Sequence, residues 1–430
     1  MRTTKSKFRY KKGDSFKSLR TFCYNASLLR NLAIKIVDNY YKETGKYLKY
    51  EGLYDRIKHT KEYRSFNSNM AQNTLRELDF NYKSFFKLLE LKKEGKYNKK
   101  VFKPKKDYGK KYRVLYINKS QIVFDEVTRT FKLPVKVGYY RNHDPIIINV
   151  PEYIDFSKVR QVQIVPKQNG SFFAVHFIRD EQIEVEQQKK DNYLSLDPGI
   201  NNLLAAVDAY GNSFIIDGRF IKSKNAFFNK KRKEITLMKR KQRIKHKTKK
   251  EISIERKREN QIKDYFEKAS KYVVDYCIKN NISTIVMGYN EDFQQSSNIG
   301  KRNNRNFSFL PLGQLRKSLK WRCEDKGIKF IEQEESYTSK ASFFDNDELP
   351  EYIKPKDRDK NYRPPTFSGS RLGRRYICED GNILNADVNG ALNILKKYGI
   401  NESKAILLNK LEELRHKGCV NQPIRIRSFN

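Results

Sequence analysis

The sequence has few cysteines and no long apolar run. Its five cysteines are scattered and never form a CxxC pair, so neither a disulfide framework nor a cysteine zinc cluster is expected. No apolar stretch approaches the roughly 20 residues of a membrane span, neither end carries a lipidation signal, and MRTTKSKFRYKKGD lacks the apolar core of a signal peptide. We therefore expect a reduced, cytoplasmic protein with no structural zinc and no membrane partner.

Acidic residues are also few relative to basic ones. Lys and Arg number 90 against 50 Asp and Glu, which gives a net charge of +40. This exceeds what solubility requires and is enough to coat a long polyanion. The 27 Tyr and 27 Phe matter beside this charge because aromatic rings stack on unpaired bases, although most such rings fill protein cores. Nucleic acid is the expected partner.

In the first half of the chain, the residue pattern changes near residue 100. Residues 15–99 contain no proline. They carry apolar residues at three-to-four spacing, such as Leu28, Leu29, Leu32, Ala33 and Ile36, which predicts a helical module. Short β-rich runs follow up to about residue 185, and the turn Gln168-Asn169-Gly170 is typical of a hairpin. If the N-terminal stretch KFRYK pairs with these strands, the helical module is an insertion in the β-rich domain.

The second half has the element order of an RNase H-like (RuvC-type) nuclease domain. YLSLDPGINNLLAAVDAYGNSFIIDG predicts three consecutive strands, with Asp197 at the end of the first. A β-branched strand over residues 283–287, a helix over 312–326 and a fifth strand, IKFIEQE, follow. A last core helix begins around Asp387, and a basic tail ends the chain.

A strongly basic stretch interrupts this order. Residues 222–250 contain fourteen Lys or Arg and one acid, Glu234, and the helical pattern continues to about residue 280. A merely solvated helix face would mix charges of both signs, so this density indicates a surface that follows phosphates. The candidate nucleic-acid contacts here are Lys230, Lys231, Arg232, Lys233, Lys239, Arg240, Lys241 and Arg243.

Two aspartates suit metal-dependent phosphodiester hydrolysis. Two-metal cleavage needs several carboxylates around hard cations, one activating water and the other stabilising the leaving oxygen. Asp197 follows an apolar strand, where a charge is costly unless a metal or another partner meets it. Asp387 lies at a helix start, where aspartate is also common as a cap. Together, in this order, the pair predicts a centre for two Mg²⁺ ions.

Three segments carry a family resemblance. SLDPGINNLLAA, EESYTSKASF and NADVNGALNIL resemble the nuclease segments of TnpB, the RNA-guided endonuclease of IS200/IS605 insertion sequences, which is related to the Cas12 effectors of CRISPR systems. The match covers residues 193–400, whereas the N-terminal half agrees in layout only. The resemblance implies a prokaryotic protein, nucleoid-associated when bound to DNA. It implies that a guide RNA, of transposon-end or CRISPR type, pairs with target double-stranded DNA, which is cut with Mg²⁺.

The resemblance also gives the expected domains their roles. The fold class is multidomain α/β, in which a β-rich wedge domain with an inserted helical recognition module precedes the RuvC-like nuclease domain. The expected bounds are 1–14 and 100–185 for the wedge domain, 15–99 for the recognition module, 192–340 and 382–430 for the nuclease domain with basic helices over 222–280, and 341–381 for an insertion that binds target nucleic acid.

This sequence departs from the family pattern at the third carboxylate. The fourth strand of the family ends in a catalytic Glu, but IVMGYNEDF places Gly288 there. Glu335, at the end of the neighbouring fifth strand, is the favoured replacement, with Glu334 second. Glu291, three residues beyond Gly288, is a further alternative that would need the chain to turn back.

A second departure concerns zinc. The family commonly carries a four-cysteine zinc finger after TSK, but this chain has Ala341 at the first cysteine position and only Cys378 in the insertion. We expect the insertion to contact DNA without zinc through basic residues that include Arg371, Arg374 and Arg375. By analogy with the family, Lys340 and Asn389 are expected near the metals.

Three functions remain open at this point. An RNA-guided, Mg²⁺-dependent DNA endonuclease is favoured by the retention of Asp197 and Asp387. A nuclease-inactive, RNA-guided DNA-binding repressor is favoured by Gly288. A transposase that performs strand transfer itself is the weakest reading, because the sequence has neither an HUH pair nor the context of a tyrosine nucleophile.

Overall fold

A computed structural model of the chain describes residues 2–7, 13–65, 67–136, 138–180, 192–290, 310–353, 362–417 and 423–429. The chain divides into two compact units, Met1–Gln182 and Ile183–Asn430, and each is considered by itself. Among the described residues, no helix combines the length and the apolar character needed to cross a bilayer.

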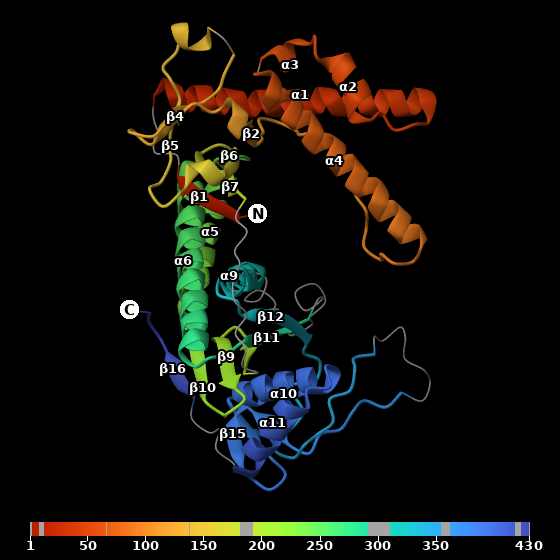
Figure 1. Cartoon of the computed structure of the whole chain (residues 1–430), viewed down its shortest axis with the longest axis vertical. Helices are drawn as coiled ribbons and strands as arrows, with labels where there is room; N and C mark the ends of the chain where they lie inside the picture. Colours follow the sequence, from red (N-terminus) through yellow and green to blue (C-terminus); the bar gives the residue numbers. More distant parts are fainter. Residues whose placement is uncertain are drawn as a thin grey trace. The chain divides into compact units, whose positions relative to one another are not determined.

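Helices fill the first part of the N-terminal unit, as predicted for residues 15–99 (Figure 1). They are α1 (Asp14–Thr44), α2 (Tyr50–Ile57), α3 (Lys61–Arg64) and α4 (Ser68–Lys93). The buried stripe of α1 runs through Leu29, Ala33 and Val37, whereas Leu28 is exposed. The three-to-four spacing therefore predicted the helix, and Leu29 and Ala33 of the predicted apolar set are on its buried face.

The strands of this unit form a four-stranded sheet in the order β1-β7-β6-β2. It contains β1 (Arg2–Lys7), β2 (Leu115–Asn118), β6 (Val159–Lys167) and β7 (Phe172–Arg179). The β6–β7 hairpin turns at Gln168, Asn169 and Gly170, which all have positive φ, as the sequence predicted. The N-terminal strand that pairs with β7 is RTTKSK, which shares Lys7 with the predicted stretch KFRYK. The rest of that stretch lies outside the described residues. The helices therefore lie, in sequence, between two paired strands.

A second, three-stranded sheet completes the N-terminal unit with β3 (Phe124–Asp125), β4 (Thr130–Lys132) and β5 (Ile147–Asn149). One hydrophobic core runs through helices and strands alike, joining Leu29 and Leu75 to Val162 and Phe177.

The C-terminal unit is built on a six-stranded sheet in the order β12-β11-β8-β9-β10-β16. As predicted, β8 (Tyr193–Pro198), β9 (Asn202–Asp208) and β10 (Ser213–Asp217) are antiparallel neighbours. The predicted fourth and fifth strands are β11 (Thr284–Tyr289) and β12 (Lys329–Glu334), and β11 is parallel to both β8 and β12. A short strand that the sequence did not predict, β16 (Ile424–Ile426), lies parallel to β10 at the edge.

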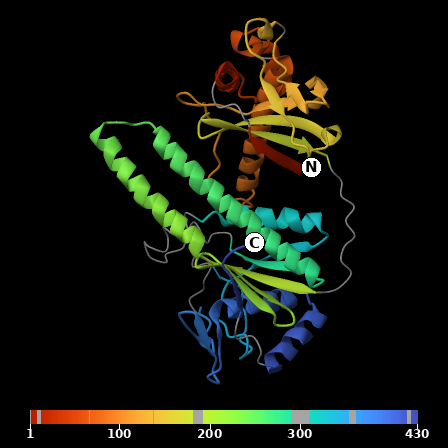
Figure 2. The ribbon, with the colours of Figure 1, turned by 90° about the vertical axis from the view of Figure 1, so that its left-hand side faces the viewer.

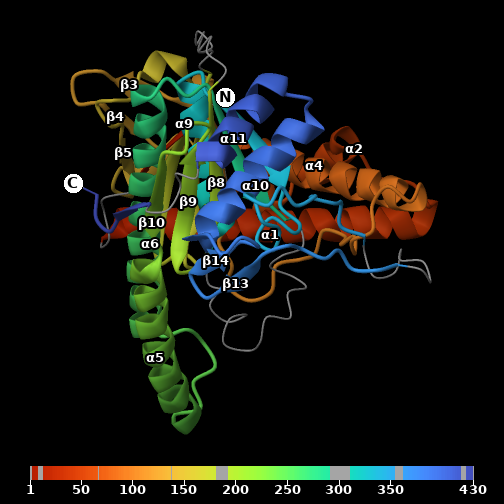
Figure 3. The same ribbon diagram turned by 90° about the horizontal axis from the view of Figure 1, so that it is seen from below.

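Helices cover both faces of this sheet (Figures 1 and 3). One face packs on α6 (Lys249–Lys279) and α9 (Leu312–Asp325), and the other on α10 (Ala386–Asn401) and α11 (Ala405–Lys417). Because strand side chains alternate between faces, Leu194 and Leu196 meet the first pair of helices whereas Tyr193 meets the second. Asp197 is four residues from Tyr193 in the same strand, so its side chain is expected on the same face of the sheet, toward α10 and α11.

The predicted basic helix is a hairpin of two helices, α5 (Arg219–Lys241) and α6, which lie side by side in Figure 2. The second helix starts with a capping box, in which Thr248 Oγ1 accepts from Glu251 N and the Glu251 carboxylate accepts from Thr248 N. This start signal was present in the sequence and was overlooked.

The insertion is more regular than its composition indicated. It contains β13 (Ser370–Leu372) and β14 (Arg375–Ile377), which form a three-stranded antiparallel sheet with β15 (Ile383–Asn385). These strands are short and rich in arginine, so neither length nor apolar alternation identified them.

Candidate active site

Three neighbouring strands end at one place on the α10 face of the C-terminal sheet. In the strand register, Leu196 lies opposite Met287, and Gly288 lies opposite Gln333. Asp197 lies one residue beyond Leu196, and Glu335 lies two residues beyond Gln333, just after the end of β12. Asp197, Gly288 and Glu335 therefore stand at adjacent strand ends. The sheet therefore brings Gly288, where the family pattern has its glutamate, close to Glu335, the predicted replacement.

Asp387 is presented by the first turn of α10. The helix is capped by Asn385, whose Oδ1 accepts from Asp387 N at 3.1 Å and from Val388 N at 3.3 Å. Asp387 is therefore not the cap, and its carboxylate is available for other contacts. Asn202 Nδ2 donates to Asp387 Oδ2, and Arg371 Nη2 donates to Asp387 Oδ1 at 2.7 Å.

The Glu335 carboxylate occupies the space that a side chain at residue 288 would need. A β-carbon at Gly288 would collide with Glu335 Oε2 and would lie 2.7 Å from Ile394 Cδ1. Glu335 Oε2 is buried and has no hydrogen-bond partner in the described part of the chain. Burial, with a smaller contribution from the charge of Glu334, raises the pKa of Glu335 to about 7.

Asp197 lies against a glycine of α10. A β-carbon at Gly390 would stand 2.7 Å from Asp197 Oδ2, so the helix approaches closely only because residue 390 has no side chain. Burial and then the charges of Glu335 and Asp387 raise the pKa of Asp197 well above its usual value, while Arg371 acts in the opposite direction. The three carboxyl groups are thus electrostatically coupled.

Glu334 is directed elsewhere. Its Oε2 accepts from Lys397 Nζ at 2.5 Å, and its Oε1 accepts from Ser336 N at 2.7 Å. Although partial burial works against ionisation, these bonds lower the pKa of Glu334 below its usual value. Glu334 is therefore neutralised by a lysine of α10, which leaves Glu335 as the carboxylate beside Asp197. Glu291 lies outside the described residues.

The donor set fits a hard divalent cation. Asp197, Glu335 and Asp387 offer carboxylate oxygens, the ligands that Mg²⁺ prefers. Glu335 Oε2 is buried without a hydrogen bond, and such an atom is costly unless an ion or water meets it. The raised pKa values of Glu335 and Asp197 have the same largest cause, which is burial, and the charges of nearby carboxylates add to it.

Asn389 does not face these carboxylates. It is fully buried, its Oδ1 accepts from Phe343 N at 3.0 Å, and its Nδ2 donates to Ala341 O at 2.7 Å. One turn later, Asn393 Nδ2 donates to Ala341 O and Thr338 O. Both asparagines hold the start of the insertion on α10, so both ends of the Asn389 amide are used in this contact. Lys340 is exposed in the same segment.

The insertion contains a second group of metal-ligand residue types. One ligand atom from each of Asp345, Cys378 and Asp380 lies within 4.8 Å of the others. Burial raises the pKa of the Cys378 thiol, and Ser342 Oγ donates to its Sγ at 3.7 Å. Since zinc binds the thiolate, this environment does not favour a zinc ligand.

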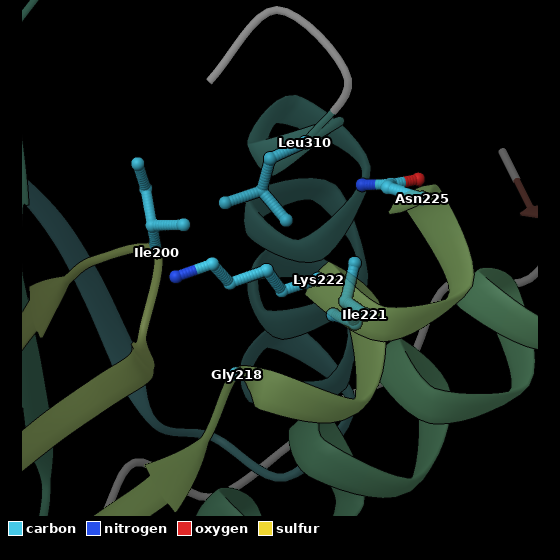
Figure 4. A pocket seen from close by; sticks show the side chains of 6 residues that line it. All are labelled: Ile200, Gly218, Ile221, Lys222, Asn225 and Leu310. Carbon is cyan, nitrogen blue, oxygen red and sulfur yellow. The ribbon is translucent and has the colours of Figure 1, made fainter. Parts of the chain in front are cut away.

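The basic hairpin begins directly beside the loop that follows Asp197. Gly218 N donates to Asn201 O at 2.8 Å, and Lys222 Nζ donates to Asn201 Oδ1 at 2.8 Å. A pocket at this junction is shown in Figure 4, lined by Ile200, Gly218, Ile221, Lys222, Asn225 and Leu310. No carboxylate lines the pocket, so it is separate from the carboxylate cluster.

Most of the expected nucleic-acid contacts on the hairpin are exposed. Lys231 pairs with Glu234 at 2.9 Å and Lys239 pairs with Glu251 at 2.9 Å, so these two lysines also stabilise the hairpin itself. The exposed residues are Lys230, Arg232, Lys233, Arg240, Lys241 and Arg243. In the insertion, Arg374 and Arg375 are exposed, whereas Arg371 pairs with Asp387.

Two family models match separate segments of the chain. Residues 175–294 match OrfB of IS605, described as a probable transposase, and residues 313–394 match the TNB domain of Cas12f1-like proteins. The TnpB-like protein ORF457 of Acidianus two-tailed virus is 24% identical over 403 residues, which span 86% of this chain and 82% of that protein. The chain is therefore similar to TnpB-like and Cas12f1-like proteins over these segments.

Solved structures were also compared with the chain at the level of the fold. The cryo-EM structure of a Cas12f1–sgRNA–target DNA complex matches with a TM-score of 0.50 and 17% identity, covering 88% of this chain and 82% of that chain. The cryo-EM structure of a CRISPR-Cas12f ternary complex matches with a TM-score of 0.34 and 14% identity, covering 88% and 80%. The mixed α/β fold of the chain resembles that of Cas12f1. The resemblance inferred from three sequence segments is confirmed by the family models and the TnpB-like relative.

Proposed function

We propose that this protein is an RNA-guided, Mg²⁺-dependent DNA endonuclease whose C-terminal unit is a RuvC-like nuclease domain. The observation that carries the proposal is the carboxylate cluster. Asp197 lies near the end of β8 and Glu335 directly follows β12, the two strands that flank β11, and Asp387 stands in the first turn of the helix that covers them. Three antiparallel strands followed by two parallel ones are the order expected of an RNase H-like sheet.

Asp197, Glu335 and Asp387 would hold two Mg²⁺ ions, which when bound supply an activated water and stabilise the leaving 3′-oxygen. The protein contributes the placement of the oxygens. Gly390 admits the Asp197 carboxylate beside α10, and Gly288 leaves room for Glu335. The ion pair with Lys397 holds the Glu334 carboxylate, so that Glu335 is the glutamate proposed as a ligand.

The exposed lysines and arginines of the α5–α6 hairpin support a role in binding a guide RNA and its heteroduplex. Phosphate contacts of this kind provide affinity without sequence specificity, which base pairing with the guide would supply. The Cas12f1 structure with the similar fold was solved with an sgRNA and target DNA. Arg374 and Arg375 of the insertion are placed on the same unit as the carboxylates and are proposed to contact the target DNA without zinc.

The decisive experiment uses protein purified with RNA co-expressed from its own locus. We expect matched double-stranded DNA to be cut when Mg²⁺ is present. Asp197→Ala, Asp387→Ala and Glu335→Gln should bind the same DNA without cutting it. Cutting that survives Asp197→Ala would refute the metal-centre assignment, and guided binding without cutting by the wild type would identify a repressor instead.

The position of the third carboxylate needs its own variants. Glu334→Gln should cut like the wild type, because Glu334 is bonded to Lys397. If Glu335→Gln cuts normally while Glu291→Gln does not, the assignment of Glu335 is wrong.

A further inference from the structure

Asn202 joins Asp387 to an arginine of β16. Its Nδ2 donates to Asp387 Oδ2, and its Oδ1 accepts from Arg425 Nη1 at 2.8 Å. A side-chain amide has one donor end and one acceptor end, and a guanidinium can only donate. Arg425 therefore fixes which end of the Asn202 amide faces Asp387, and that end is the donor.

The sheet holds Arg425 in this place. β16 pairs with β10 so that Arg425 lies opposite Ile215, and Arg425 Nη1 lies 3.4 Å from Asp217 Oδ2. Asp217 is buried and is also bonded by Arg219. The same segment is anchored by Phe429, whose ring packs on Tyr265 with a centroid distance of 5.2 Å.

Asp217 reaches this arginine because of a local irregularity in the sheet. β9 and β10 shift register between Ile216 and Asp217, so that Asp217 lies opposite Asn202. Such irregularities re-aim side chains at strand ends. Asp217, Arg425 and Asn202 then form a continuous chain of hydrogen bonds that ends on the Asp387 carboxylate.

The two oxygens of Asp387 have different partners. Oδ2 takes the neutral amide of Asn202, while Oδ1 faces a cation, the guanidinium of Arg371. We infer that Asn202 and Arg425 are positioning residues that orient the Asp387 carboxylate and leave Oδ1 as the oxygen for a metal ion. The inference rests on the proposed function in that it takes Asp387 to be a metal ligand. Partners of metal ligands typically contribute about 10- to 100-fold in metal affinity.

The test measures metal binding separately from cleavage. Mn²⁺ binding to the RNA-bound protein is followed by electron paramagnetic resonance, and the binding that Asp387→Ala abolishes is taken as the site. We expect Asn202→Ala and Arg425→Met each to raise the half-saturating Mn²⁺ concentration by about tenfold. Cleavage should show the same shift in its Mg²⁺ dependence and should recover largely at saturating Mg²⁺, because the carboxylates remain.

Arg427→Met is the matched control. It removes the same charge two residues further along, from a side chain that is exposed. Arg427→Met should bind Mn²⁺ like the wild type. The double variant Asn202→Ala/Arg425→Met should be no weaker than Asn202→Ala, because Arg425 acts through Asn202.

Two results would overturn the inference. One is wild-type Mn²⁺ affinity in Arg425→Met with an unchanged melting temperature. The other is a loss of Mn²⁺ affinity in the double variant that equals the product of the two single losses, which would mean that the two residues act separately. If the wild type binds Mn²⁺ at this site but does not cut DNA, the proposed function fails, and the Mn²⁺ curves of the variants still decide the inference.

Discussion

Glu335 and Gly288 are complementary: the carboxylate of one fills the space in which the other has no side chain. The two residues belong to neighbouring parallel strands, and Gly288 lies opposite Gln333 in the register. Their relationship allows a direct exchange experiment. Gly288→Glu alone should abolish cutting, since the new side chain and Glu335 cannot both fit, whereas Gly288→Glu combined with Glu335→Gly should restore cutting to a measurable rate.

The measurement for this exchange is the rate of cutting of matched DNA at saturating Mg²⁺. Each single variant should lose more than about 100-fold, because even residues that only support metal ligands contribute 10- to 100-fold in affinity. The double variant could fold and bind the guide yet be as inactive as Glu335→Gly. That result would contradict the idea that a glutamate at position 288 or 335 brings its carboxylate to the same point in the site.

Gly390 should be intolerant of even one methyl group. Gly390→Ala places a β-carbon 2.7 Å from Asp197 Oδ2, so either the carboxylate or the helix must move. We expect Gly390→Ala to lose metal binding while the helix remains. Gly313→Ala in α9 is the control, because nothing lies within 4 Å of the added carbon. It should be neutral or stabilising by up to about 1 kcal/mol, as measured by urea unfolding.

The pKa of Glu335 predicts how stability depends on pH. In the metal-free protein, folded Glu335 keeps its proton up to about pH 7, whereas its ordinary pKa is 4.5. Folding is therefore favoured below pH 4.5, and this advantage is lost as the pH rises through about 7. Between pH 5 and 8, metal-free wild type should lose on the order of 3 kcal/mol of unfolding free energy relative to Glu335→Gln.

Metal binding should also depend on pH through the protonation of Glu335. Because a cation displaces the proton of Glu335, the half-saturating Mn²⁺ concentration should fall between pH 6 and 8 in the wild type. Glu335→Gln should lack most of this dependence. Equal slopes for the two proteins would show that Glu335 is not a ligand.

The ion pair with Lys397 predicts that Glu334 has a purely structural role. The Lys397 side chain is 4% exposed and that of Glu334 is 47% exposed, so Glu334→Gln leaves a buried ammonium without its charged partner. We expect a loss of about 1–2 kcal/mol in unfolding free energy, reduced by the exposure of Glu334, with cutting unchanged. Glu332→Gln, which breaks the Arg316–Glu332 pair at 3.2 Å, should lose less than about 1 kcal/mol.

Arg371 should compete with the metal. Its guanidinium bonds Asp387 Oδ1 at 2.7 Å and is 40% exposed, so the pair is worth at most about 1 kcal/mol. Arg371→Ala should therefore tighten Mn²⁺ binding by up to about fivefold and lower the melting temperature of the metal-free protein. Exposed Arg374 provides the control, and Arg374→Ala should change neither value. Weaker Mn²⁺ binding in Arg371→Ala would mean that the arginine assists the metal instead.

The sequence predicted the parts of the C-terminal unit that have strong patterns. Apolar strands and the DPG turn identified β8 to β10, and the ends of neighbouring parallel strands placed Glu335 beside the gap at Gly288. Asn202 and Arg425 were missed because they are far apart in sequence and meet only through the pairing of β10 with β9 and β16. The strands of the insertion are three residues long, too short for any periodicity to appear.

The role of Arg371 was also beyond the sequence. A charge-based reading grouped it with Arg374 and Arg375 as a DNA contact, but β13 and β14 place it on Asp387. Only the fold distinguishes an arginine that faces solvent from one that faces a carboxylate.

The pairing of Gly288 with Glu335 has a consequence for how such chains are sorted by alignment. A search that requires glutamate at the end of one strand would class this chain with relatives that have lost catalysis, although the neighbouring strand supplies a carboxylate to the same place. Parallel strands finish at a common edge, so a ligand can change its position in the alignment by many residues while hardly moving in space. Glutamates at 288 and 335 should therefore be mutually exclusive among homologues, and the two columns should be read as one.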